Sequence, residues 1–442
     1  MSGRPPKQRK QASLQLPAVA GPGLRLRAAQ SAQDLERIAA FNALVHQETG
    51  IAVFTRWRFS STHPRASEAR LLYVEDVATG QIVSSLGVML QTWRYEDIQL
   101  DVGEVELVGT HPDYRHRGLM RAQMQAVERI LQERDCLLSC ILGIPYFYRQ
   151  FGYEYAIPVL SCASLRLDQV LALAADQPEP VCIRRMVVQT DLAAVMALYE
   201  AQAAELGLTS VRSEALWRYQ ETVPPDSPEP LETYVVEDGT GIIGYFRVRK
   251  NLWANELDLA EASVRPGGQV WGSRDVLLAI LRSAKMLASQ RGYGKLQFTL
   301  PGCHALVSTA RYLGVQAERP YAWQVRITDH AAFLRRIAPA LERRLAHSLM
   351  AGFSGSLRIN CMARLLHLQF DQGRLRAVTD DGFQQGVGDS QVPPLLLTQW
   401  LLGYRDREEI AAQHLDFRVS PPARQLLDIL FPRIEAYIYQ AD

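Results

Sequence analysis

Hydrophobic and polar residues in the first third of the chain follow the periods of alternating strands and helices. Patterns typical of strands cover residues 24–29, 70–93, 97–110 and 136–142. Helical periodicity follows Ser31, a residue suited to an N-cap, and a second helix is expected from Arg117 to about Glu133. A turn at Thr79-Gly80 divides the long strand segment, and a short helix leads into a last strand over residues 146–155. The predicted order is β-α-β-β-β-α-β-α-β, a mixed α/β module.

A weaker version of this order recurs later in the chain. The segment YVVEDGTGIIGYFRV is similar to the one that begins at Tyr73, RGYGKLQFTLPG to RDCLLSCILGIP, and ARYLGVQ to YRQFGYE. The period is too long for a solenoid, so we interpret it as the duplication of a whole domain. Between the copies, Pro178 and Pro180 discourage a continuing helix and mark a boundary.

A third pattern begins near His330. Helical periodicity over 331–349 gives way to strand-like residues 355–378 and then to an apolar helix over 393–404. We therefore predict an α/β (α+β) protein with two mixed-sheet modules in tandem, followed by an α+β domain. The predicted divisions are a disordered tail at 1–23, modules at 24–176 and 181–328, and the third domain at 329–442.

Composition excludes several classes of function. With 48 Lys and Arg against 47 Asp and Glu, the chain has no general affinity for nucleic acid or for an anionic membrane, so an anion site would have to be local. No run of roughly 18 apolar residues predicts a membrane span. Six scattered cysteines, without paired spacing or clustered histidines, predict neither a disulfide framework nor a metal site and favour the reducing cytoplasm.

The stretch ELVGTHPDYRHRGLMRAQM, residues 106–124, concentrates positive charge where a strand pattern turns into a helix pattern. A helix N-terminus has unpaired backbone N–H groups and a partial positive charge, and it therefore attracts phosphate. Gly118 at the turn allows a ligand close to the backbone, and three arginines add charge. On charge alone, a solvated basic helix start explains the pattern equally well.

The stretch VGTHPDYRHRGLM, followed by PYFYRQFGY, resembles the acetyl-CoA-binding motif of the GNAT N-acetyltransferase superfamily. The family pattern R/Q-x-x-G-x-G/A falls on Arg115, Gly118 and Met120, where Met120 replaces the usual small residue. From Leu24 onward the layout resembles the enhanced intracellular survival (Eis) type, which has a working GNAT module, a degenerate one and a sterol-carrier-protein-like domain. The resemblance implies two GNAT-like mixed-sheet modules and acetyl-CoA as co-substrate.

By position, the resemblance implies three groups of binding residues. Val108, Gly109 and Thr110 would pair with the pantetheine arm, and Gly143 and Ile144 would flank the thioester. The pyrophosphate would be held by Arg115, His116, Arg117, Gly118, Leu119, Met120 and Arg121. A strand that separates from its neighbour leaves N–H and C=O groups free for an amide-bearing ligand, which agrees with the first group.

The resemblance also implies a general acid and a base. Tyr148 matches the tyrosine that protonates the leaving sulfur of coenzyme A, and Tyr146 is the alternative if that alignment is wrong. In Eis-type proteins the terminal carboxylate enters the active site, which here would be that of Asp442. Glu106 and Glu104, on one face of the motif strand, are rival bases whose pKa would rise if they lay beside an apolar cleft.

The second copy has Ala310 where the first has Tyr148, and GGQVWGSR in place of RHRGLMR, so we expect a scaffolding role for it. The function hypothesis is acetyl transfer to a primary amine of an aminoglycoside-like, polyamine-like or lysine-peptide acceptor, by direct attack through a tetrahedral intermediate. The alternative is a non-catalytic acyl-CoA- or lipid-binding protein. The resemblance further implies a homo-oligomer, with a hexamer among the expected forms.

Overall fold

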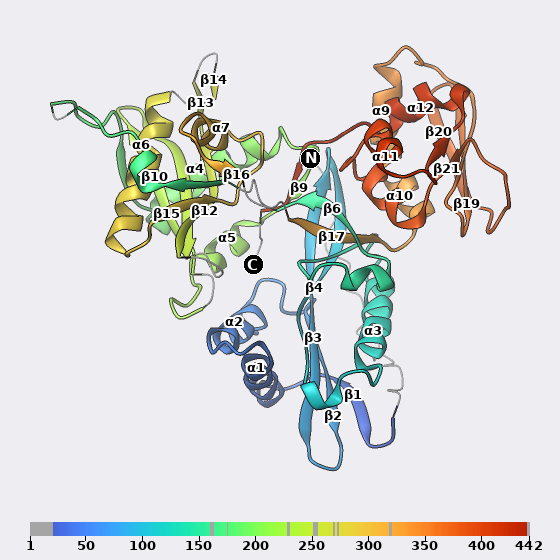
Figure 1. The fold of residues 1–442 in the computed structure, drawn as a ribbon, viewed down its shortest axis with the longest axis horizontal. Helices are drawn as coiled ribbons and strands as arrows, with labels where there is room; N and C mark the ends of the chain where they lie inside the picture. The colour runs from blue at the N-terminus through green and yellow to red at the C-terminus, as the bar shows by residue number, and fades with distance from the viewer. Residues whose placement is uncertain are drawn as a thin grey trace.

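The computed structural model describes residues 21–159, 163–174, 176–227, 230–250, 255–267, 270–271, 274–317 and 321–439. Within these ranges the strands form sheets of nine, seven and five strands and a two-stranded ribbon. The predicted fold class, mixed-sheet α/β modules followed by an α+β domain, is confirmed (Figure 1). Most of the predicted tail, residues 1–20, lies outside the described residues.

The first sheet has the order β1-β2-β3-β4-β5-β17-β6, with β9 on the edge of β3 and β23 on β9. Its strands are β1 (Leu24–Ala28), β2 (Arg70–Asp76), β3 (Gln81–Tyr95), β4 (Ile98–Thr110), β5 (Leu138–Ile141), β6 (Glu154–Pro158), β9 (Leu208–Ser210), β17 (Ala322–Ile327) and β23 (Ala436–Tyr437). Helices α1 (Ala32–His46) and α2 (Gly50–Arg58) cover one face, and α3 (Leu119–Glu133) covers the other (Figure 1). Ser31 caps α1 as predicted, whereas α2 was not anticipated.

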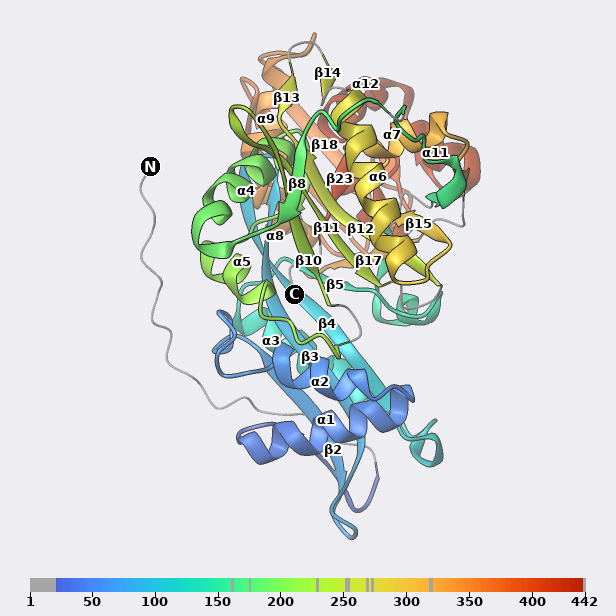
Figure 2. The same cartoon turned by 90° about the vertical axis from the view of Figure 1, so that its left-hand side faces the viewer.

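The second sheet has the order β16-β7-β15-β12-β11-β10-β8. Its strands are β7 (Ala163–Arg166), β8 (Cys182–Arg185), β10 (Glu232–Asp238), β11 (Gly241–Lys250), β12 (Glu256–Val264), β15 (Lys295–Phe298) and β16 (Gln316–Ala317). The ribbon is β13 (Pro266–Gly267) with β14 (Val270–Trp271). Helices α6 (Arg274–Gln290) and α7 (Ala305–Tyr312) pack on one face, and α4 (Val188–Ala203) and α5 (Glu214–Gln220) pack on the other (Figure 2).

The two sheets exchange strands across the predicted boundary at 176/181. Strand β17, which comes from the second predicted module, lies between β5 and β6 of the first sheet. Strand β7, which comes from the first predicted module, pairs with β15 of the second sheet. A division made along the sequence therefore does not coincide with either sheet, and the two modules are held together by backbone hydrogen bonds.

The third part has a sheet of order β20-β19-β18-β21-β22. Its strands are β18 (Gly355–Asn360), β19 (Leu365–Asp371), β20 (Arg374–Asp380), β21 (Ser390–Gln391) and β22 (Arg418–Val419), and its helices are α8 (His330–Arg336), α9 (Ala338–Ala346), α10 (Pro394–Leu401), α11 (Arg407–Gln413) and α12 (Arg424–Leu430). The predicted helix over 331–349 is divided at Ile337, because Pro339 fits the first turn of a new helix but not a helix interior.

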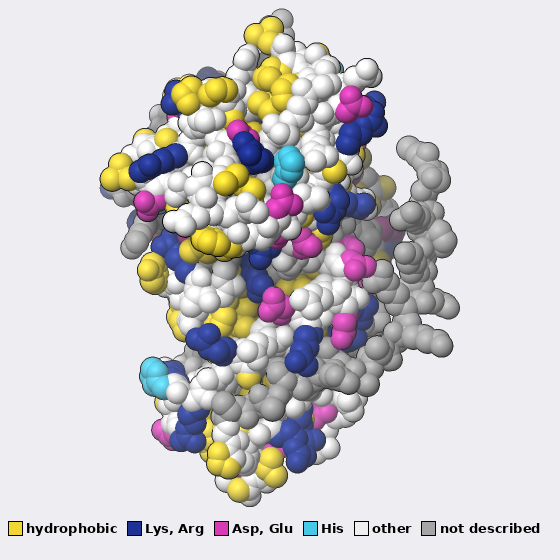
Figure 3. Space-filling view, turned by 90° about the vertical axis from the view of Figure 1, so that its right-hand side faces the viewer, with side chains coloured by type: hydrophobic (Ala, Val, Ile, Leu, Met, Phe, Trp, Pro, Cys, Tyr) yellow, Lys and Arg dark blue, Asp and Glu magenta, His cyan; other side chains and the backbone are white. Residues whose placement is uncertain are grey.

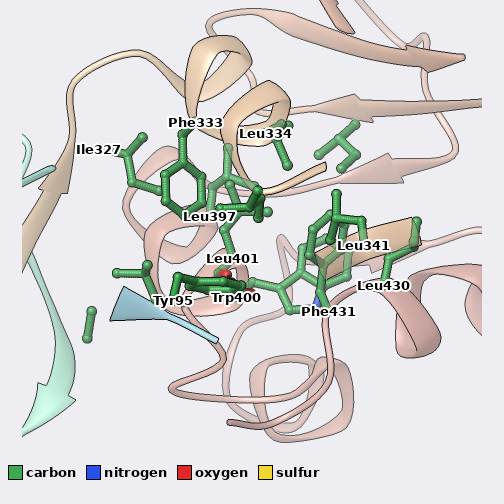
Figure 4. Packing of buried hydrophobic residues seen from close by; sticks show 14 of the residues in the cluster. Tyr95, Ile327, Phe333, Leu334, Leu341, Leu397, Trp400, Leu401, Leu430 and Phe431 are labelled. Atoms are coloured by element: carbon green, nitrogen blue, oxygen red, sulfur yellow. Dashed lines mark hydrogen bonds between the residues drawn. The ribbon is translucent and has the colours of Figure 1, made fainter. Parts of the chain in front are cut away.

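The core of the third part continues into the first sheet. Tyr95, at the end of β3, points into the cluster that contains Trp400, Leu401 and Phe431 (Figure 4). Its hydroxyl donates to the carbonyl oxygen of Leu401 at 3.2 Å, and Arg344 donates to the same hydroxyl at 3.1 Å. On the face shown in Figure 3, basic and acidic side chains are interspersed, in keeping with the balanced composition.

Candidate functional site

A gap opens between β4 and β5, the two parallel strands at the centre of the first sheet. Their pairing ends at Glu104 and Cys140, whereas β4 continues to Thr110. Within this continuation, Leu107 has a φ of 50° and the pairing with β3 shifts, which makes a β-bulge. Beyond Glu104, the edge of β4 that faces β5 therefore offers backbone N–H and C=O groups to an added chain.

The predicted pantetheine residues Val108, Gly109 and Thr110 all lie on this continuation of β4. A Cβ at Gly109 would lie 2.4 Å from Cγ1 of Val45, so α1 packs directly on the strand there. On the other side, the buried Ser84 hydroxyl lies 2.9 Å from the carbonyl oxygen of Gly109 and 2.7 Å from Oε1 of Gln123 on α3. The open end of β4 is thus held from both faces of the sheet.

The turn before α3 forms a second open surface beside this gap. Gly118 is the N-cap of α3 with a φ of 74°, and a Cβ there would meet no atom within 4 Å. His116 also has a left-handed backbone, with a φ of 62°. Because no side chain caps α3, its first backbone N–H groups face open space and carry the positive end of the helix dipole.

The side chains around this turn fall into two groups. Arg115, His116, Arg117 and Arg121 are exposed, whereas Leu119 is buried. Met120 is half-buried and packs against the core of the first module, so its bulk is directed away from the turn. The guanidinium of Arg117 donates to the carbonyl oxygen of Asp113 at 2.9 Å and lies 4.6 Å from the ring centroid of Tyr114.

Tyr148 lies beside the residues that the resemblance assigns to the thioester. It stands in the short helix η2 (Phe147–Phe151) and is 5% exposed. A Cβ at Gly143 would lie 2.0 Å from Cε2 of Tyr148, so the ring rests directly on the backbone that follows β5. Burial, followed by the neighbouring Tyr153 and Tyr321, raises the pKa of Tyr148 above the ordinary tyrosine value. The phenol therefore stays protonated at neutral pH, as a proton donor must.

The alternative acid, Tyr146, is placed differently. Its side chain is 71% exposed, its φ is 70°, and the guanidinium of Arg149 lies 5.0 Å from its ring centroid. Ile144, the other residue expected beside the thioester, is 65% exposed. Of the two tyrosines, Tyr148 alone has its ring against Gly143.

The rival bases Glu104 and Glu106 share one cationic partner. The fully buried Arg58 donates from Nη2 to Glu104 Oε2 at 2.8 Å and from Nε to Glu106 Oε1 at 3.0 Å. The Gln91 amide also donates to Glu104. A raised pKa was expected only if these carboxylates lay beside an apolar cleft, and the structure gives them the hydrogen-bonding partners Arg58 and Gln91 instead. Arg58 comes from α2, which the sequence did not reveal.

Asp442, the residue whose terminal carboxylate the resemblance assigns to the site, lies outside the described residues. The chain leading to it is described up to Tyr439. Strand β9 runs antiparallel to β3, and β23 runs parallel to β9. Strand β23 therefore runs in the direction opposite to β3, beside β9. The role of Asp442 stays a prediction.

The second sheet provides an internal comparison for the gap. Strands β12 and β15 pair up to Leu259 and Phe298, and β12 then continues, as β4 does. Here Nε2 of the buried His304 lies 3.0 Å from the carbonyl oxygen of Ala262, while Nδ1 accepts from the Leu306 N–H at 3.1 Å. Burial lowers the pKa of His304 to about 4, so the neutral ring donates through Nε2. One of the backbone groups beyond the last pair thus already has a partner.

Two residues near Gly143 were missed by the sequence reasoning. The Gln324 amide donates from Nε2 to the carbonyl oxygen of Gly143 at 2.9 Å, and the Tyr321 hydroxyl donates to the same oxygen. Gln324 belongs to β17, and Tyr321 directly precedes that strand. No local pattern links them to the motif, because roughly 180 residues separate them from Gly143.

Residues 25–156 match the family model described as an acetyltransferase (GNAT) domain. The match includes the gap after Glu104, the turn at Gly118 and Tyr148. The predicted enzyme class, an acetyltransferase, is confirmed by this match. No curated protein matches the sequence.

Solved structures are similar in fold over nearly the whole chain. A protein from Enterococcus faecalis V583, described as a probable N-acyltransferase, is 13% identical with a TM-score of 0.68. A GCN5-related N-acetyltransferase from Anabaena variabilis is 15% identical with a TM-score of 0.67. Eis1 from Mycobacterium abscessus is 15% identical with a TM-score of 0.61. Each similarity covers 94% of this chain and 99% of the other, and it concerns the fold.

Two further findings concern the described part of the chain. None of its helices combines the length and the apolar character that crossing a membrane requires. It also contains no group of three or more His, Cys, Asp and Glu side chains placed to hold a metal ion.

Proposed function

We propose that the protein is an acetyl-CoA-dependent N-acetyltransferase that transfers acetyl to a primary amine. The observation that carries this proposal is the meeting of three features: the end of β4 that pairs with β3 but no longer with β5, the N-terminus of α3 without a side-chain cap, and the Tyr148 ring resting on Gly143. These three environments suit, in this order, the amide-bearing pantetheine arm, the pyrophosphate and the leaving thiolate of the co-substrate.

The residues present fit acetyl-CoA, which supplies an acetyl group activated as a thioester. Val108, Gly109 and Thr110 offer an open strand edge, and the open space at Gly118 leaves room for a pyrophosphate beside exposed arginines. Gly143 and Ile144 stand across the gap from that strand, where they would flank the thioester. In this arrangement the backbone N–H groups orient the ligand, the charge of Arg115, Arg117 and Arg121 neutralises phosphate, and His116 adds a hydrogen-bonding group.

The chemical step proposed is direct attack of the amine on the thioester carbonyl through a tetrahedral intermediate. Tyr148 donates a proton to the departing sulfur, and its raised pKa keeps that proton available. For the base we propose the terminal carboxylate of Asp442, which assists deprotonation through water or holds the ammonium form of the acceptor. Glu106 and Glu104 are the rivals, and their shared contact with Arg58 ties both to a fixed positive charge.

The acceptor proposed is an aminoglycoside-like or polyamine-like molecule or a lysine side chain in a peptide. A surface pocket of about 370 Å³ between α2 and α5 supports an acceptor with a flat or apolar portion. The rings of Trp57 and Tyr219 stack in it with centroids 5.1 Å apart. The same helix, α2, also supplies Arg58 to the carboxylates of β4.

The alternative is a non-catalytic acyl-CoA- or lipid-binding protein. In the third domain, which we propose is sterol-carrier-protein-like, Trp400 and Phe431 pack with ring centroids 5.5 Å apart, so this part of the core is filled by side chains (Figure 4). The protein is further proposed to be a cytoplasmic homo-oligomer, with a hexamer among the forms that light scattering would test. Binding of metals, nucleic acid or membranes is not part of the proposal.

Free-thiol release from acetyl-CoA tests the enzyme against the binder. The assay uses a panel of polyamines, aminoglycosides and lysine peptides, with acetyl-CoA affinity measured by calorimetry on the same preparation. Amine-dependent thiol release is the expected result. Tight acetyl-CoA binding without release for any amine would favour the binding protein.

A further inference from the structure

Two hydrogen-bond donors, one on β17 and one directly before it, point at a single carbonyl group after β5. Gln324, which is 1% exposed, donates to the carbonyl oxygen of Gly143 at 2.9 Å, and the Tyr321 hydroxyl donates to the same oxygen. Gly143 follows the end of β5, at the open gap. A buried polar side chain with its donor committed to a loop carbonyl fixes the orientation of that peptide group.

The direction of this carbonyl determines where the neighbouring N–H points. Strand β5 lies between β4 and β17, and the carbonyl of Gly143 is turned toward β17. The peptide is trans, so its C=O and N–H point in opposite directions. The N–H of Ile144 is therefore turned toward the gap and β4. Two donors on the carbonyl also polarise the amide, which strengthens that N–H as a donor.

The same peptide supports the ring of the acid candidate. Because a Cβ at Gly143 would lie 2.0 Å from the ring of Tyr148, any rotation of this peptide changes where the ring can sit. Tyr321 also lies close enough to Tyr148 to raise its pKa. Gln324 and Tyr321 thus influence two groups that we expect beside the thioester, namely the peptide after Gly143 and the ring of Tyr148.

We propose that Gln324, assisted by Tyr321, is a positioning residue that holds and polarises the Gly143–Ile144 peptide, so that the Ile144 N–H binds a carbonyl oxygen of the acyl-pantetheine arm. This inference rests on the proposed function. Strand β17 then does more than complete the sheet. Through Gln324, the second module would contribute to acyl-CoA binding in the first module.

The test compares Gln324→Leu with Gln399→Leu. Gln399 is a matched control, because it is also buried and its amide donates to a backbone carbonyl, that of Tyr155, at 3.0 Å. Acetyl-CoA affinity is measured by calorimetry, thermal stability by calorimetric scanning, and the Ile144 amide by NMR with selective ¹⁵N-isoleucine labelling, assigned through Ile144→Val. Coenzyme A without the acetyl group is titrated in parallel.

Gln324→Leu should weaken acetyl-CoA binding roughly 5- to 30-fold, the scale of one impaired hydrogen bond to the ligand. The Ile144 amide signal should move upfield before any ligand is added. Gln399→Leu should lower stability to a similar extent while leaving affinity and the Ile144 signal unchanged. An equal loss for coenzyme A would assign the contact to a pantetheine amide, and a loss confined to acetyl-CoA would assign it to the thioester carbonyl.

Two results would overturn the inference. If Gln324→Leu binds acetyl-CoA as tightly as wild type, or if the Ile144 signal does not move, the peptide is not polarised from β17. The proposed function fails separately. A wild type that binds acetyl-CoA but acetylates no amine would refute catalysis while the affinity comparison still holds, whereas a wild type that does not bind acetyl-CoA would refute both.

Discussion

The Tyr148 ring can pack against the backbone at residue 143 because Gly143 has no side chain. The ring of Tyr148 occupies the volume that a Cβ at this position would need, with only 2.0 Å between that Cβ and Cε2. Glycine is used here for close approach, since its φ is not left-handed. The phenol is therefore brought against the backbone that leads from β5 into the loop, and burial there raises its pKa.

Tyr148→Phe keeps this packing but removes the proton. We expect kcat to fall roughly 10²-fold or more, with little change in acetyl-CoA affinity, because general-acid loss acts on the chemical step. Because burial raises the pKa of Tyr148, loss of its proton should not lower the wild-type rate at any pH below about 10, the ordinary tyrosine pKa. Steady-state kinetics across pH provides the measurement. Full activity in the variant would exclude this acid and direct attention to Tyr146.

Gly143→Ala adds the methyl group for which there is no room. The ring of Tyr148 must move, and overpacking of this kind costs about 1–3 kcal/mol of stability. We expect a lower Tm together with a loss of kcat larger than the loss of folded protein. Gly294→Ala is the control, because a Cβ there meets nothing within 4 Å and the backbone is not left-handed. Equal kinetics for the two variants would show that the ring position does not matter.

At the scale of elements, the sequence predicted what local pattern determines. Helix α3 ends at Glu133 as expected, and Ser31 caps α1, because periodicity and capping are encoded within a few neighbouring residues. Helix α2 was missed because it has only nine residues, begins at a glycine and has no side-chain cap at its N-terminus. The two-residue strand β23 and the three-residue β9 had no pattern to detect, since their pairing is entirely non-local.

The residues of the candidate site also divide into those that one local motif contains and those that come from distant parts of the sequence. The motif from Arg115 to Arg121 is contiguous, so one stretch of sequence suffices to propose it, and the structure has a turn without a side-chain cap at Gly118. By contrast, Arg58, Tyr321 and Gln324 reach the site from other elements. The positions of Tyr321 and Gln324 follow from the sheet order β4-β5-β17, and that of Arg58 follows from the packing of α2, neither of which one sequence reveals.

The N-terminus of α3 offers a test of charge at fixed shape. Gly118→Asp and Gly118→Asn add side chains of nearly equal size into open space, and Asn and Asp both tolerate the left-handed backbone better than other residues. Only aspartate repels a pyrophosphate. We expect Asp to weaken acetyl-CoA binding at least tenfold more than Asn at low salt, with the difference shrinking as salt is added. Equal affinities by calorimetry would contradict a phosphate site at this turn.

The whole molecule is interlocked around the first sheet. Strand β17 joins it from the second module, and β9 and β23 extend it along β3. Tyr95 anchors its far end in the core of the third domain (Figure 4). The C-terminal segment is held at Tyr439, whose carbonyl oxygen accepts from the Ser210 hydroxyl at 3.1 Å and whose hydroxyl accepts from Gln202 at 3.2 Å. The chain is therefore held, as far as Tyr439, by residues of the second module.

Deletion of the last three residues tests whether the terminal carboxylate acts as the base. Deletion of residues 440–442 keeps Tyr439, whose hydroxyl accepts from Gln202, and Tm is measured beside kcat so that a loss of stability is separated from a loss of activity. If the terminal carboxylate assists deprotonation or amine binding, kcat should fall about 10²-fold, with partial recovery on adding a small carboxylate such as acetate. Asp442→Asn should be mild, because it keeps the main-chain carboxylate.

Glu106→Gln is the opposing variant, and its interpretation needs a stability measurement. Removing one carboxylate from buried Arg58 costs about 3–5 kcal/mol when no other partner remains, but Glu104 still accepts from Arg58 at 2.8 Å, so a smaller loss is expected. Activity per folded molecule should then stay within a few-fold of wild type. A harmless tail deletion combined with a folded but inactive Glu106→Gln would place the base on β4 and refute the role of Asp442.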